Sequence, residues 1–382
     1  PPPPPPPPHI HAQDGIRDPD HSLVGSEMCI RDSVNSDLGD LVETERGFTN
    51  YLEISKELLN LEPANPKWTM EVSYALGNMG WLGEARKDSD PEKILEYMQS
   101  SLEFNRKALM LDPENTDFRV ALTTAHADLA DAYLTVCNLG QALVNRQRNV
   151  DLASEFLASN PADSNLKENL AYAKTGLAKV QSLVGLIDQA LDNYGESKQL
   201  LDDLFRQDPS NLRYRWGLEL RQQRIAIIYS HTDRRQQALE SFNQLATSFR
   251  EIRHLEDAMN IDGMEEYSIY LNKYSQLAFV LGDRLLSETL LEEELQLITD
   301  LVSSNPDVAI GRHRLVYAAF QYWQQKGRLP DSTVMGLLDG YLSNPSEVRS
   351  CFDADAASRL SLLKGNRGEA SGYTSYLLGQ GY

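Results

Sequence analysis

The chain has 382 residues, a formal net charge of −20 and only three cysteines. So negative a charge repels phosphate backbones, and we therefore expect no nucleic-acid partner. The few cysteines argue against a disulfide-built scaffold, and no stretch approaches the ~18 consecutive apolar residues of a membrane span.

The first 33 residues differ from the rest of the chain. They open with eight prolines and contain VGSEMCIRD at Val24–Asp32, which matches the in-frame translation of a transposase-type sequencing adapter. Residues 1–33 are therefore interpreted as an adapter-derived artefact, expected to be disordered and excluded from fold reasoning. The competing interpretation is a genuine polyproline II linker.

Downstream, a short joint built around proline recurs along the chain. It reads LEPAN at Pro63, LDPEN at Pro113, SNPAD at Pro161 and QDPSN at Pro209, and then SNPDV at Pro306. The intervals are 50, 48 and 48 residues, followed by one of 97, and the missing joint falls near Asp257. Such regular spacing is typical of a repeat architecture.

The residues around each joint predict two helices per unit. Large apolar side chains recur five, nine and sixteen positions after the proline, as in Phe118, Leu122 and Leu129. These steps put them on one face of a helix. Proline ends the preceding helix, and the Asn or Asp two residues later can cap the next one. We expect these caps at Asn65, Asn115, Asp163 and Asn211.

A second break is expected within each unit, near Gly185, Asp233 or Gly282. No stretch alternates with period two for long enough to predict a sheet. The fold class is therefore predicted to be all-α, with each unit an antiparallel helical hairpin.

The same residues resemble the tetratricopeptide repeat, whose pattern is Leu-Gly, an aromatic three residues on, and a small residue twelve after the Gly. The best copies are Leu129-Ala130 with Tyr133 and Ala142, Leu177-Ala178 with Ala190, and Ile225-Ala226 with Tyr229 and Ala238. Weaker copies are Met79-Gly80 with Ile94, and Tyr274-Ser275 with Ser287. The resemblance implies a right-handed α-solenoid of stacked antiparallel hairpins.

The repeat here is longer than the familiar unit of about 34 residues. A 48-residue spacing places seven extra residues, about two turns, in each helix. The chain in this respect resembles long-unit arrays of bacterial signalling proteins. We expect the array over residues 34–306 and divergent helical hairpins that continue the solenoid over residues 307–382.

Side chains that could carry chemistry are few, and each has a simpler interpretation. The histidines outside the prefix lack metal-ligand spacing, and no phosphate-binding glycine loop is present. Cys137 is expected to be a buried thiol, and Glu292–Glu294 a solvated helix face. Tyr317, Phe320, Tyr322 and Trp323 have core spacing. We expect no catalytic residue, cofactor or metal.

One basic row is a candidate binding site. Six residues after the prolines stand Arg119, Lys167, Arg215 and Arg312, and one heptad further lie His126 and Lys174. Equivalent positions stack in a solenoid, so these side chains could form a ladder for the carboxylates of an acidic or C-terminal peptide. Alternatively, acids such as Glu168 and Glu219 neutralise the row, which then contributes little.

Two functions follow from this pattern. The first is a non-catalytic scaffold that binds a protein or peptide in the solenoid groove, and the alternative is a regulatory or sensor arm of a larger bacterial signalling protein. An enzyme is not expected, and a cytoplasmic location is.

Overall fold

The computed structural model describes residues 41–85, 90–255, 261–304, 309–339, 341, 348 and 350–379. The expected disorder of residues 1–33 and the joints at Asp257 and Pro306 lie outside these residues. Within them, the chain forms helices and turns and no strand, which confirms the all-α prediction.

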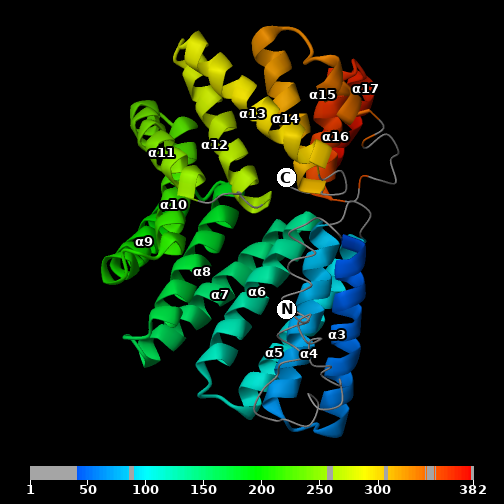
Figure 1. Cartoon of the computed structure of the whole chain (residues 1–382), viewed down its shortest axis with the longest axis vertical. Helices are drawn as coiled ribbons and strands as arrows, with labels where there is room; N and C mark the ends of the chain where they lie inside the picture. The colour runs from blue at the N-terminus through cyan, green and yellow to red at the C-terminus, as the bar shows by residue number, and fades with distance from the viewer. Residues whose placement is uncertain are drawn as a thin grey trace, which may run out of the picture.

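The helices follow one another along the whole described chain (Figure 1). In order they are α3 (Leu41–Leu61), α4 (Pro66–Ala85), α5 (Pro91–Leu111), α6 (Thr116–Thr135), α7 (Leu139–Ser159), α8 (Ser164–Leu183), α9 (Ile187–Gln207), α10 (Leu212–Ser230), α11 (Arg235–Leu255), α12 (Ile261–Val280), α13 (Arg284–Ser304), α14 (Ala309–Lys326), α15 (Ser332–Leu337), α16 (Cys351–Leu363) and α17 (Arg367–Gly379).

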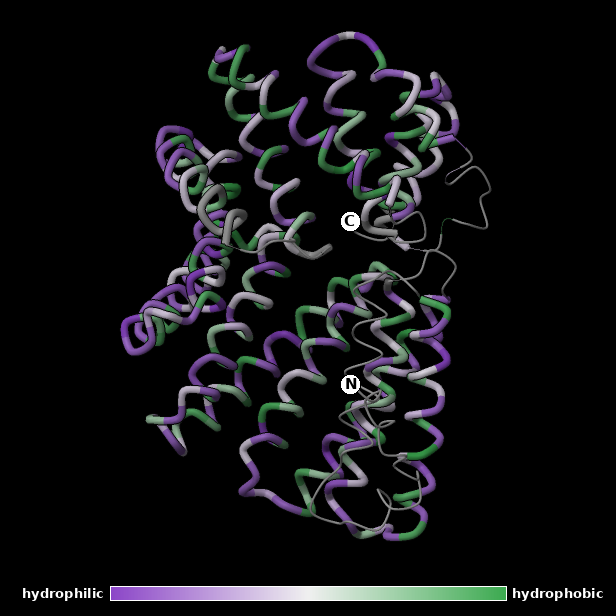
Figure 2. The backbone as a smooth tube through the Cα atoms, in the orientation of Figure 1, coloured by the Kyte–Doolittle hydropathy of each residue, from purple (hydrophilic) through white to green (hydrophobic). Residues whose placement is uncertain are grey.

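The hairpins stack into a curved, right-handed α-solenoid of the tetratricopeptide type (Figure 1). We call α4, α6, α8, α10, α12 and α14 the first helices, and α5, α7, α9, α11 and α13 the second helices. Successive first helices touch one another, as α6 does with both α4 and α8. Because neighbours lie closer on the inside of a curve, the first helices form the concave side. Apolar and polar segments alternate along every helix (Figure 2), as expected for amphipathic elements packed on both flanks.

The helix boundaries confirm the predicted punctuation. The side-chain oxygens of Asn115, Asp163 and Asn211 accept hydrogen bonds from backbone N–H groups in the first turn of α6, α8 and α10. Asn65 does the same for the N–H of Lys67 at 2.9 Å. These caps satisfy amides that a helix start leaves without partners.

Small residues mark the contact between the helices of each hairpin. Ala130, Ala142, Ala178, Ala190, Ala226, Ala238, Ser275 and Ser287 all have an exposed fraction of 0%. Where both positions hold serine, Ser275 Oγ donates to Ser287 O and Ser287 Oγ donates to Ser275 O, each at 2.9 Å. This reciprocal bonding satisfies both hydroxyls and confirms the predicted register.

The predicted leucines belong to the core between helices. Leu177 packs with Val150, Ala153, Leu170 and Ala173 in a cluster between α7 and α8. Leu129, also buried, joins α5, α6 and α7 in the preceding cluster. Both of these clusters are confined to neighbouring hairpins, so the core is a chain of small cores rather than one centre.

Cys137 differs from the sequence-based expectation. It is buried as predicted, but it is disulfide-bonded rather than a free thiol, and its bonded cysteine lies outside the side chains described here. Its φ of 63° places it in the left-handed region, where the equivalent residues Gly185 and Gly282 also lie. Cys137 packs against Ala354 and Leu377, so the C-terminal hairpin α16–α17 contacts the end of α6.

Substitutions at Leu177 and Ala190 test this packing. We expect Leu177→Ala to lower the free energy of unfolding by about 2–5 kcal/mol, because it leaves a cavity. Ala190→Leu should lower it by about 1–3 kcal/mol, because a larger side chain has no room against Tyr194 and Ile228. Denaturant unfolding measures both. The exposed Leu183→Ala is the control, and equal midpoints for all three variants would contradict the packing.

Candidate functional site on the concave face

The residues of the predicted basic ladder are largely engaged within the protein. The Arg119 side chain is only 15% exposed, and its Nη2 lies 3.1 Å from Glu114 Oε2. Its Nε donates to Pro113 O at 2.9 Å, and its guanidinium stacks over the Phe156 ring. Arg119 is therefore not the exposed ladder residue that capture of a peptide carboxylate requires, because its side chain ties the start of α6 to the preceding joint and to α7.

The other ladder residues also contact the protein or are partly buried. Lys174 Nζ pairs with Glu196 Oε2 at 2.5 Å, and the Arg312 guanidinium lies over the Tyr341 ring. Lys167 and Arg215 are half-buried. Glu168, one of the acids expected to neutralise the row, pairs instead with Arg213 at 2.9 Å.

His126 is a core residue. Its exposed fraction is 3%, and its Nδ1 lies 3.0 Å from Asn145 Oδ1 in the contact between α6 and α7. Burial lowers the pKa of His126, which disfavours the charged form that a carboxylate-binding ladder needs.

The sequence predicted that Glu292–Glu294 form a solvated helix face, and this is wrong for Glu294. Glu294 has an exposed fraction of 0% and lies in a polar network between α12, α13 and α14. Its carboxylate accepts hydrogen bonds from Ser268 Oγ at 3.0 Å, Asn272 Nδ2 at 2.9 Å and Arg314 Nη2 at 3.1 Å. Burial raises the pKa of Glu294, opposed chiefly by Arg314.

The concave face carries charged residues that the sequence analysis did not single out. They are Glu84 on α4, Asp128 and Asp131 on α6, Lys179 on α8, Arg224 on α10, Glu265, Glu266 and Lys273 on α12, and Arg314 on α14. The register offered one signal, because Trp81, Asp131 and Lys179 all stand eighteen residues after a joint proline.

Several of these side chains form ion pairs between helices. Asp131 Oδ2 accepts from Arg146 Nη2 of α7 at 2.6 Å. Arg224 of α10 pairs with Glu266 of α12. Burial alone would raise the pKa of Asp131, but Arg146 and Lys179 outweigh it and lower that pKa.

Other carboxylates on this face have shifted pKa values because the protein encloses them without a close cation. Burial raises the pKa of Glu84 to about 8, with further contributions from Asp131 and Asp128. Burial, helped by Asp131, raises the pKa of Asp128 to about 7. Burial and Glu266 raise the pKa of Glu265. Each side chain keeps some solvent contact, as expected at the bottom of a concave surface.

Lys179 connects two of these carboxylates electrostatically. It acts electrostatically on Glu84 of α4 and also on Glu265 of α12. Since α8 is separated from α12 by α10 in the stack, the curvature must bring α12 towards α8. Figure 1 shows α4 to α12 following one another around this curve.

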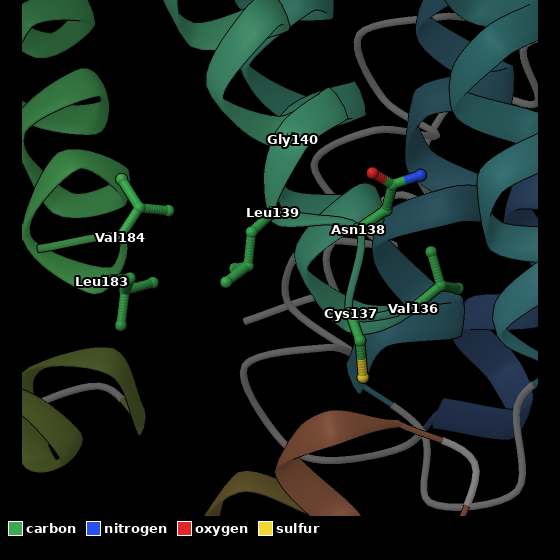
Figure 3. A pocket seen from close by; sticks show the side chains of 7 residues that line it. All are labelled: Val136, Cys137, Asn138, Leu139, Gly140, Leu183 and Val184. Carbon is green, nitrogen blue, oxygen red and sulfur yellow. The ribbon is translucent and has the colours of Figure 1, made fainter. Parts of the chain in front are cut away.

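A separate cleft lies at the edge of the array. Val136, Cys137, Asn138, Leu139, Gly140, Leu183 and Val184 line an open space of about 580 Å³ between the α6–α7 and α8–α9 turns. Figure 3 shows the Cys137 sulfur pointing away from Leu183 and Val184. None of the described helices is long and apolar enough to cross a membrane, and the described residues hold no cluster of potential metal ligands.

Comparison with known proteins supports the fold. No family model matches the chain, and no curated protein matches it in sequence. The apo form of the quorum sensor NprR from B. thuringiensis superposes over 97% of this chain and 91% of its own, at 13% identity and a TM-score of 0.52. The Rap conjugation gene regulator of plasmid pLS20, in complex with the Phr* peptide, covers 81% and 74%, at 9% identity and a TM-score of 0.54.

A further structure, NprR in complex with its cognate peptide NprX, covers 96% of this chain and 89% of its own at 12% identity and a TM-score of 0.50. At such low identities these likenesses establish a shared architecture, a tetratricopeptide-like helical repeat.

Removing the buried carboxylate tests the network around Glu294. Glu294→Ala leaves the Arg314 charge without its acid, and we expect the free energy of unfolding to fall by about 3–5 kcal/mol. Glu292→Ala, on the exposed face of the same helix, should change it by at most about 0.5 kcal/mol. Similar unfolding midpoints for both variants would contradict the burial of Glu294.

The raised pKa values predict a pH dependence of stability. Because the folded-state pKa values of Glu84 and Asp128 exceed their unfolded values, the folded state binds more protons, and stability falls as pH rises from about 4 through about 8. Glu84→Gln with Asp128→Asn removes this loss. The variant should therefore gain stability over the wild type as pH rises, measured by unfolding midpoints from about pH 5 to about pH 8.5. A difference independent of pH would refute the enclosure of these acids.

Proposed function

We propose that this chain is a non-catalytic interaction protein that binds a peptide, or an extended segment of a protein partner, along the concave face of the solenoid. The observation that carries the proposal is the concave face itself, which holds partly buried carboxylates of α4, α6 and α12 and the exposed Lys179 of α8, within electrostatic reach of Glu84 and Glu265. A stacked array forms such a surface without any catalytic residue. Two structures of this architecture, the Rap regulator with Phr* and NprR with NprX, hold peptides.

As part of this proposal, the 48-residue unit is a lengthened tetratricopeptide repeat like those of bacterial signalling proteins. Nothing in the described part of the chain favours the other function, a regulatory arm of a larger signalling protein. We expect the binding to take place in the cytoplasm.

Two candidate binding sites compete for the partner. One is the predicted basic ladder, of which Lys167 and Arg215 keep partial exposure. The other is the middle of the concave face, around Asp128 and Lys179. The ladder would select acidic peptides, so the two answers can be separated by experiment.

Selection from a random peptide display library, followed by three sets of variants, tests the proposal. Thr124 is exposed on α6 one turn before Asp128, so Thr124→Trp should obstruct the concave face and weaken selected peptides by about tenfold or more. Ser154→Trp, on the exposed side of α7, is the matched control and should leave affinity unchanged. Fluorescence anisotropy measures both.

The third variant combines Arg119→Ala, Lys167→Ala and Arg215→Ala. A loss of binding there, without a loss in Thr124→Trp, would assign the peptide to the ladder instead. If the selected peptides bind the two tryptophan variants and the ladder variant with the same affinity as the wild type, the groove proposal is wrong.

A further inference from the structure

Three carboxylates on the concave face stand out by what they lack. Glu84, Asp128 and Glu265 form no ion pair with any of the described residues. Glu84 Oε1 is, in addition, a buried oxygen without a hydrogen-bond partner there. An enclosed carboxylate without a partner is unfavourable, because protein replaces the water that would stabilise its charge.

Several other partly or fully buried acids of the array are paired. Asp131, Glu266, Glu294, Asp355 and Glu168 each have an arginine at hydrogen-bonding distance, and Asp353 has His313 at 2.9 Å. The three exceptions come from α4, α6 and α12 and therefore share no local sequence cause. Glu84 is within electrostatic reach of Asp128 and of Lys179, and Lys179 in turn acts on Glu265, which links the three acids along the concave face.

Lys179 does not balance these charges. It lowers the pKa values of Glu84 and Glu265 without forming an ion pair with either, and both pKa values remain raised. Arg146 is already paired with Asp131. Arg224 and Arg314 also act on Glu265 but are paired with Glu266 and Glu294, so none of these cations is paired with Glu84, Asp128 or Glu265.

Two aromatic side chains extend this surface along α4. Tyr74 is 44% exposed and Trp81 is 45% exposed, and with Glu84 they stand at helical spacings of seven and three residues, which place them on one face. Trp81 makes a T-shaped contact with the Phe48 ring of α3, with the ring centroids 6.4 Å apart, and nearly half of its surface remains exposed. Exposed aromatic faces attract ammonium and guanidinium groups.

We propose that the concave face between α4, α6 and α12 binds a cationic segment, a peptide or protein stretch carrying lysine or arginine, through Glu84, Asp128 and Glu265 with Trp81 and Tyr74 beside them. This rests on the proposed function and names the chemistry of its partner. A basic side chain supplies the missing positive charge at the acids, and its alkyl stem or guanidinium plane packs on the aromatic rings.

Binding is coupled to protons in a defined direction. A cation next to Glu84 and Asp128 favours their ionised forms, so protons leave the protein as the segment binds. The charged groups that act on Glu84 are Asp131, Asp128, Lys179 and Arg146, and those that act on Asp128 are Asp131 and Arg146. Affinity for a basic segment therefore rises with pH through the range in which these two acids titrate.

Hexalysine, hexaglutamine and hexaglutamate peptides with blocked termini and a fluorescent label serve as probes. Their binding is measured by fluorescence anisotropy at near-physiological salt, so that distant charges are screened. We expect the affinity to be highest for hexalysine, lower for hexaglutamine and lowest for hexaglutamate. The triple variant Glu84→Gln, Asp128→Asn and Glu265→Gln should weaken hexalysine binding by about tenfold or more, since hydrogen bonds to charged groups are lost.

A matched variant controls for the acidity of the whole chain. Glu103→Gln, Glu155→Gln and Asp192→Asn remove the same number and type of charges from exposed positions on second helices. This control should lower hexalysine affinity by less than about threefold, because exposed charges contribute little. It should also keep the rise of affinity between about pH 6 and about pH 8.5, which the concave triple variant loses.

The outcomes separate this inference from the proposed function. Equal losses in both triple variants, or a preference for hexaglutamate, would overturn the cationic partner. If library-selected peptides lose affinity in Thr124→Trp but carry no basic residue, the groove function stands and the cationic assignment falls. Circular dichroism and unfolding midpoints at neutral pH confirm that both triple variants are folded, so a loss of binding reports on the site.

Discussion

The close approach of two helices at a small residue is the constraint on which this architecture depends. Ala142 and Ala190 are fully buried where a second helix crosses the first helix of its own hairpin and meets the neighbouring unit. A side chain larger than alanine there would separate the two helix backbones and shift the contacts of the next units in the stack. Where alanine is replaced, as at Ser275 and Ser287, the two hydroxyls bond each other's carbonyl and keep the helices near. The same reciprocal bonding recurs at Ser73 and Ser101, which lie one heptad farther from the turn in α4 and in α5 than the positions equivalent to Ser275 and Ser287. The added helical turns therefore repeat the original contact.

Because nearly all contacts join neighbouring helices, with the packing of Cys137 on α16 and α17 as an exception, the array has no single central core. Polar side chains bridge successive first helices. Arg213 of α10 reaches Glu168 of α8, and Arg224 of α10 reaches Glu266 of α12. Gln321 of α14 donates to Asn272 O of α12 at 3.2 Å. These contacts lie on the inner side of the curve, where they hold the first helices together. Polar pairing therefore shapes the concave face, while apolar packing builds the hairpins.

Sequence predicted the parts of this structure that depend on backbone position alone. Caps such as Asn115, breaks such as Gly185 and the buried positions of Leu177 and Ala190 follow from helix periodicity. It failed where a side chain's direction decides. Three consecutive residues on a helix point about 100° apart, so Glu292 to Glu294 could not all face water, and the last is buried. A register position locates the Cα of Arg119 but not the guanidinium at the end of its long side chain. Electrostatic influence across the curve, as of Lys179 on Glu265, joins units that lie far apart in the sequence.

Charge pairing and unpaired charge have different consequences in a structure of this kind. The paired acids hold neighbouring helices and belong to the stability of the array. Burial disfavours the ionised forms of Glu84, Asp128 and Glu265, the three acids without an ion pair, and Asp128 adds repulsion at Glu84. In the proposed site these acids therefore contribute to recognition of a basic segment and not to the stability of the free array, because a bound cation favours the charge that burial disfavours.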